Sequence, residues 1–243
     1  MRLSRVYVEA PLASGTRVRL EGSAASHVTR VLRLRVGEAL TLFNGAGGEY
    51  SGSIDKSHGG EVTVALGEHR AIERESPLAL TLVQGISRGE RMDLVVQKAT
   101  ELGVARLVPV LTERSVVRLD AHQADRKLLH WRAIMIGACE QSGRNRLPEL
   151  APPVALRELL RAPAAPGTRL LLSPQAARRL ADLAPPQGAI SVLIGPEGGL
   201  SEEEQQAAVS AGYEAVRMGP RVLRTETAAL AALTLLQQAF GDL

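Results

Sequence analysis

The pattern of apolar and polar residues changes near residue 74. Upstream of it, short segments alternate apolar and polar residues as half-buried strands do, for example at Arg17–Glu21, Glu38–Phe43 and Glu61–Leu66. Downstream, continuous apolar runs alternate with segments of helical spacing. A charged connector containing Pro77 separates the two patterns. We therefore expect two domains, residues 1–73 and residues 74–243.

The first domain is predicted to be a small β-rich module. A further strand is expected around Tyr50–Ile54, after the turn residues Asn44-Gly45 and Gly47-Gly48. One short helix fits Ala24–Leu32, with Ser23 as its cap. On this helix His27, Arg30 and Arg33 can share one face, while Val28, Val31 and Leu32 are expected to turn inward.

The second domain is predicted to be an α/β domain with a mainly parallel sheet and helices on both faces. Residues 151–168, rich in proline and alanine, are expected to form a surface connection. The expected strands and helices are Leu78–Gln84, Arg91–Leu102, Val104–Leu111, Arg169–Ser173, Ile190–Ile194, Glu214–Met218 and Thr225–Phe240.

Two strand–turn–helix corners follow one another in this domain. The first has Gly195, Gly198 and Gly199 after the strand, and Ser201 with Glu204 predicts a capping box at the next helix. The second ends its strand at Gly219-Pro220. Such corners bring bare backbone close to a ligand, although an ordinary β-to-α connection has the same pattern.

Composition narrows the classes of function. The single cysteine, Cys139, rules out an internal disulfide framework and favours a reducing, cytoplasmic setting; a buried structural role suits it better than that of a nucleophile. The scattered histidines predict no metal site. Residues 1–40 hold seven arginines against three glutamates, which indicates either phosphate binding or a solvated basic face. We see no signal sequence and no apolar run long enough for a membrane span.

The quoted corners carry a family resemblance. Ile194-Gly-Pro-Glu-Gly-Gly followed by Leu223-Arg-Thr-Glu-Thr-Ala resembles the SPOUT methyltransferases, and more narrowly the bacterial RsmE family. Other matching segments are Arg88-Gly-Glu-Arg-Met-Asp, Lys98–Gly103, Glu113–Val116 and Glu140–Arg144. The resemblance implies an N-terminal PUA-like β-barrel, a C-terminal domain with a trefoil knot, and a homodimer. It also implies that S-adenosylmethionine (SAM) is the cofactor and that N3 of a uridine in 16S ribosomal RNA of the small subunit is methylated.

The resemblance also implies site residues. Arg30, Arg33, Arg88, Arg114 and Arg144 are expected to contact RNA, with no membrane and no metal involved. The catalytic candidates are Arg224, Glu226 and Glu197. The expected cofactor contacts are Leu172, Ser173, Ile194, Gly195, Pro196, Glu197, Gly198, Gly199, Met218, Gly219, Val222, Leu223, Arg224, Thr225, Thr227 and Ala228.

A pyrimidine N3 must lose its proton as it accepts a methyl group. Glu197 or Glu226 is suited to accept that proton, and Arg221 and Arg224 to offset negative charge on the uracil carbonyls. An equal alternative is that Glu226 only caps the last helix or pairs with Arg224, and the sequence leaves these interpretations open. Two other functions also stay open. One is a SPOUT ribose 2′-O-methyltransferase acting on ribosomal or transfer RNA, and the other is an RNA-binding assembly factor without turnover.

Overall fold

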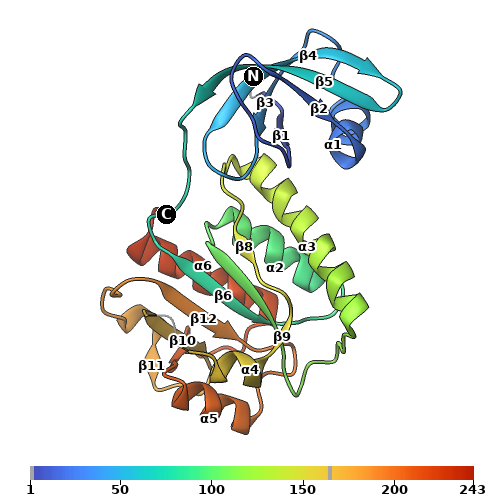
Figure 1. The fold of residues 1–243 in the computed structure, drawn as a ribbon. Helices are drawn as coiled ribbons and strands as arrows, with labels where there is room; N and C mark the ends of the chain where they lie inside the picture. Colours follow the sequence, from blue (N-terminus) through green and yellow to red (C-terminus); the bar gives the residue numbers. More distant parts are fainter. Residues whose placement is uncertain (1–2, 164–165) are drawn as a thin grey trace. The chain divides into compact units, whose positions relative to one another are not determined.

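The computed structural model describes residues 3–163 and 166–243, which divide into two compact units (Figure 1). Of the described residues, the first unit comprises 3–75 and 136–147, and the second comprises 76–135, 148–163 and 166–243. The helix α3 (Ala121–Ser142) therefore contributes its last residues to the first unit.

The first unit is built on a five-stranded sheet with the order β1-β3-β4-β5-β2. All neighbouring strands are antiparallel except the parallel pair β1–β3. Alternate strand residues, among them Leu40, Leu42, Val62 and Val64, are buried in one apolar core, as the period-two pattern predicts. The strands are β1 (Arg5–Tyr7), β2 (Arg17–Leu20), β3 (Ala39–Phe43), β4 (Glu49–His58) and β5 (Glu61–Arg70).

The helical segment of this unit differs from the prediction. It consists of α1 (Gly22–Ser26), which has no side-chain cap, and a π-helical turn η1 (His27–Val31). The N–H of Leu32 bonds to the carbonyl of His27, five residues back, so the turn is wider than an α-helical one. The prediction that Val31 turns inward is therefore wrong, since its side chain is 66% exposed. Arg33 ends the helix in the left-handed region, at φ 56°.

The second unit confirms the predicted parallel sheet. Its strand order is β11-β13-β10-β12-β6-β7-β8, with β9 also paired to β7, and every pairing is parallel. The strands are β6 (Leu80–Gly85), β7 (Arg106–Leu111), β8 (Glu149–Leu150), β9 (Val154–Ala155), β10 (Thr168–Leu172), β11 (Arg178–Arg179), β12 (Ile190–Ile194) and β13 (Glu214–Arg217).

Helices cover both faces of this sheet, because its central strands are apolar on both sides. Ile190, Val192 and Ile194 of β12 join the core under α2 and α6, whereas Leu193 joins the core under α4 and α5 (Figure 1). The helices are α2 (Glu90–Glu101), α4 (Leu156–Arg161), η2 (Leu180–Asp182), α5 (Glu202–Ser210) and α6 (Thr225–Phe240).

Residues 151–168 are not the simple surface connection expected. They contain β9 and α4, and Leu156 is buried against the sheet. Short elements such as these carry too few residues for a periodic signal. The predicted ends of β12 and α6 are confirmed. In the described part of the chain, no helix combines the length and the apolar character needed to cross a membrane.

Candidate active site

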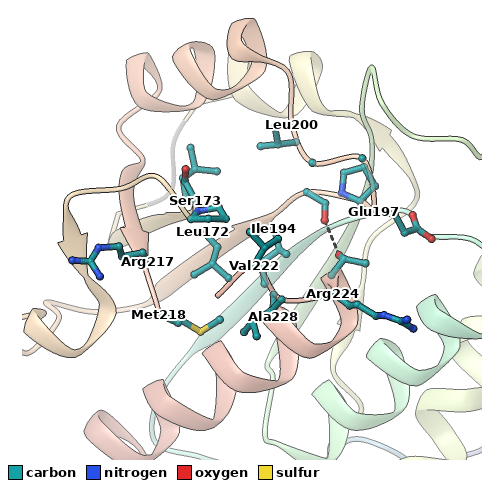
Figure 2. Close-up of a pocket in the computed structure, with 18 of the residues that line it drawn as sticks. Leu172, Ser173, Ile194, Glu197, Leu200, Arg217, Met218, Val222, Arg224 and Ala228 are labelled. Atoms are coloured by element: carbon teal, nitrogen blue, oxygen red, sulfur yellow. Dashed lines mark hydrogen bonds between the residues drawn. The ribbon is translucent and has the colours of Figure 1, made fainter. Parts of the chain in front are cut away.

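The second unit contains a cavity of about 660 Å³ where three chain segments meet, a size that suits a small-molecule ligand (Figure 2). The segments follow β10, β12 and β13, whose carboxyl ends share one edge of the parallel sheet. Ligands of open α/β sheets commonly bind at this edge. The lining residues of the three segments are Leu171–Gln175, Ile194–Leu200 and Arg217–Gly219 with Arg221–Glu226 and Ala228.

The expected cofactor contacts gather here. Every one of them lines the cavity except Thr227, which is exposed on the first turn of α6. Leu172, Ile194, Met218, Val222 and Ala228 supply the apolar part of the wall, as Figure 2 shows. The wall thus combines apolar side chains and glycine backbone with charged and polar side chains, which suits a ligand with an aromatic ring and a short polar chain.

The glycines of the first corner permit a tight turn. A Cβ on Gly195 would lie 2.9 Å from the carbonyl carbon of Gly199, and Gly199 has φ +69°. A Cβ on Gly85, at the end of β6, would lie 2.4 Å from the nitrogen of Pro196. The turn therefore folds onto itself and onto the neighbouring strand, with no room for a side chain at Gly195 or Gly85. The predicted capping box of Ser201 and Glu204 closes it and is confirmed.

Thr225 fixes the start of α6 against this turn. Its hydroxyl donates to the carbonyl of Gly195 at 2.6 Å (dashed line in Figure 2) and accepts from the amide of Gln84 at 2.9 Å. Gln84 and Thr225 are both buried. The hydrogen bond from Thr225 to Gly195 thereby links the second corner to the first, and both corners line the cavity.

Two carboxylates lie at one end of the cavity with Arg91 between them. Glu197 Oε1 accepts from the backbone N–H of Arg88 at 3.0 Å and from Arg91 Nη1 at 2.8 Å. Burial opposes ionisation of Glu197, but these bonds outweigh it and lower its pKa. Glu226 Oε1 lies 4.0 Å from Arg91 Nε, while Glu226 Oε2 is buried without a hydrogen-bond partner among the described residues.

The arginines expected to contact RNA fall into two groups. Arg30, Arg33, Arg88 and Arg114 are exposed, and Arg114 also lines the cavity. Arg144 is buried, and its Nη2 lies 2.5 Å from Glu75. The structure therefore commits the side chain of Arg144 to an ion pair inside the first unit, and we leave it out of the RNA contacts proposed below.

Sequence reasoning missed several residues that line the cavity. Arg91 was inside a segment that matches the family, yet nothing in the sequence shows that it reaches the corners more than a hundred residues away. The others are Leu171, Pro174, Gln175, Leu200, Gln205 and Arg217. The sequence feature that could have indicated them is their position at or after the ends of β10, β12 and β13.

Comparisons with known proteins agree with this geometry. Residues 74–237 match the family model of the RNA methyltransferase domain, and residues 20–67 match that of the RNA methyltransferase PUA domain. The ribosomal RNA small subunit methyltransferase E of Buchnera aphidicola is 31% identical over 100% of this chain and 98% of its own length. That of Mycobacterium tuberculosis is 32% identical over 93% of this chain and 88% of its own length.

Solved structures match over the whole chain. The ribosomal RNA small subunit methyltransferase E of Neisseria gonorrhoeae, bound to S-adenosyl methionine, is 41% identical, with a TM-score of 0.95 over 99% of both chains. Lpg2936 from Legionella pneumophila, in complex with the bound cofactor SAM, is 43% identical, with a TM-score of 0.96 over 100% of both chains. The chain belongs to the ribosomal RNA small subunit methyltransferase E family, with an RNA methyltransferase domain and a PUA domain.

Proposed function

We propose that this protein transfers the methyl group of SAM to N3 of a uridine in 16S ribosomal RNA of the small subunit. The cavity at the carboxyl edge of the parallel sheet supports this proposal most directly, in a chain 41% identical throughout to a SAM-bound relative. The ribosomal substrate follows from the names of the curated relatives, and the N3 position from the family.

The cavity fits SAM in its donor set and in its shape. Gly199 and Gly219 line the cavity and have open space where a side chain would stand, and Leu172 and Met218 offer apolar surface. When bound, SAM supplies an electrophilic methyl group for in-line displacement. The protein must hold the uracil ring with N3 on that axis, and the target base must be unpaired because N3 lies on its pairing edge.

The two carboxylates are suited to different tasks. Glu197 is tied to Arg91 and to the backbone of Arg88, and its lowered pKa makes it a poor proton acceptor. Glu226 Oε2 is buried without a partner in the described part of the chain. We therefore assign the removal of the N3 proton to Glu226 and the placement of Arg91 to Glu197. The exposed Arg221 and Arg224 offset charge on the uracil carbonyls.

The remaining assignments follow from the same function. Residues 1–73 form the PUA-like RNA-binding domain, where Arg30 and Arg33 contact phosphates, and residues 74–243 form the methyltransferase domain with its trefoil knot. Helix α6 supplies a homodimer interface through Leu235, which is 44% exposed, and the half-buried Leu230 and Phe240. A ribosomal substrate places the protein in the cytoplasm.

The decisive test is transfer of labelled methyl from SAM into small ribosomal subunits that lack the modification. We expect 3-methyluridine after nucleoside mass spectrometry, and no label in subunits that already carry it. A ribose-methylated nucleoside would replace this proposal with a 2′-O-methyltransferase. Salt-sensitive RNA binding without any transfer would indicate an assembly factor.

A further inference from the structure

The loop after β7 carries Arg114 to the mouth of the cavity. The loop is a tight turn, in which the N–H of Thr112 donates to Ser115 Oγ and the N–H of Ser115 to the carbonyl of Thr112, both at 3.1 Å. Arg114 Nη1 donates to the carbonyl of Gly198 at 3.4 Å. Among residues 3–163 and 166–243, no carboxylate pairs with this exposed guanidinium. It is therefore available to a ligand beside the cavity.

The carboxylate of Glu204 ties this loop to the first corner. Glu204 is only 3% exposed, and both of its oxygens are used. Oε1 accepts from the N–H of Glu113 at 2.8 Å, and Oε2 accepts from the N–H of Ser201 at 3.0 Å. The capping box would need only the second bond. The first bond instead reaches a loop that lies 91 residues away in the sequence. It holds that loop at Glu113, the residue next to Arg114.

The loop also contacts the first corner at two further places, Ser201 and Gly198. The hydroxyl of Ser201 and the guanidinium of Arg157 both bind the side chain of Glu113, and together they lower its pKa. A Cβ on Gly198 would lie 3.1 Å from Arg114 Cβ and 3.2 Å from the carbonyl oxygen of Arg114. The backbone of the loop therefore rests on the glycine turn.

We infer that Glu204 is a positioning residue that fixes Arg114 at the cavity mouth, where Arg114 binds a phosphate of the RNA beside the target nucleotide. This inference rests on the proposed function. Paired hydrogen bonds from arginine to phosphate depend strongly on angle, so a fixed loop raises affinity by avoiding an ordering step on binding. The neighbouring Glu202 and Glu203 are exposed and have the same charge, so charge alone does not explain the burial of Glu204.

The test is Glu204→Gln, assayed for methyl transfer into unmodified small subunits, for SAM affinity and for thermal stability. The amide replaces one of the two carboxylate oxygens by an NH2 group, which cannot accept, so the N–H of either Glu113 or Ser201 loses its present acceptor. We expect the KM for the subunit to rise about fivefold to tenfold, with kcat and SAM affinity changed less than about twofold. Glu203→Gln removes the same charge from the same helical turn and should leave all three quantities unchanged.

A double-mutant cycle with Arg114→Ala separates positioning from helix capping. If Glu204 acts through Arg114, adding Glu204→Gln to Arg114→Ala should raise the KM less than about twofold further. Additive effects, or a KM unchanged by Glu204→Gln, would overturn the inference. If Glu204→Gln fails to fold, Glu113→Gln tests the same loop from its exposed side, and it too should have no effect once Arg114 is removed. Absence of transfer by the unmutated protein would instead contradict the proposed function itself.

Discussion

The two units each contain a glutamate shielded from solvent, and they use it in opposite ways. In the first unit, Glu49 pairs with Arg5 and accepts from Asn145 Nδ2 at 3.4 Å, with side chains only 6% and 7% exposed at Arg5 and Glu49. Arg5 Nη2 in turn donates to Asn145 Oδ1 at 2.5 Å, and its guanidinium lies 4.8 Å from the ring of Phe43. This network joins β1, β4 and the chain after α3 within one compact unit.

In the second unit, Glu226 is half-buried, with a side chain 13% exposed, and its environment differs. One of its oxygens lies at the 4.0 Å limit of an ion pair, and the other has no partner among the described residues. A buried polar atom without a partner destabilises the fold by about 1–3 kcal/mol. The difference indicates that Glu49 holds its unit together, and it supports the role of proton acceptor that we propose for Glu226.

The largest expected effect is on Glu226. Glu226→Gln keeps the shape but removes the basic oxygen, so kcat for methyl transfer should fall about 100-fold to 1000-fold. Affinity for SAM should change little, and the free energy of unfolding should not fall, because the unpartnered buried atom no longer belongs to a charged group. Single-turnover transfer, SAM calorimetry and urea unfolding measure the three quantities.

Glu197→Gln is the matched comparison. Because Glu197 already accepts two bonds and has a lowered pKa, its loss should reduce kcat less than about tenfold, through the placement of Arg91. If Glu197→Gln proved the more damaging change, the two carboxylates would exchange roles.

The next largest effect concerns the network of the first unit. Arg5→Met leaves Glu49 buried without its main partner and should lower the free energy of unfolding by about 3 kcal/mol. Arg17→Met removes an ion pair with Asp55 in which the arginine side chain is 68% exposed. This change should alter the free energy of unfolding by less than about 1 kcal/mol. Chemical denaturation of the two variants measures both. Equal losses would mean that burial does not distinguish these pairs.

The sequence predicted the parts of the fold whose signals are local. Continuous apolar runs placed β12 and α6 to the residue, and Ser201 with Glu204 predicted the capping box that the structure contains. The three segments around the cavity were also within reach, because glycines and strand ends mark them along the chain.

The residues that local pattern could not place are those fixed by distant partners. Arg144 follows a glycine turn, which suggests a surface, but Glu75 draws it into a buried ion pair. Arg91 becomes part of the cavity only because Glu197 lies beside it in space. Val31 is exposed because one π-helical turn rotates its face, a change that helical periodicity alone does not reveal.

The smallest expected effect is on Cys139, which is fully buried in the first unit. Burial raises the pKa of its thiol to about 12, whereas in the unfolded chain it is about 8.5. Between these values the unfolded chain loses a proton that the folded chain keeps, so stability should fall as pH rises above about 8.5. The loss should be about 1 kcal/mol by pH ~9.5 relative to Cys139→Ala, in which this titration is absent. Urea unfolding of the unmutated protein and of Cys139→Ala, at pH ~8.5 and pH ~9.5, measures the difference. A thiol reagent should label Cys139 only when urea has unfolded the protein. Rapid labelling of the folded protein would mean that the core around Cys139 is accessible to solvent. The buried interior of the first unit would then differ less from the open cavity of the second.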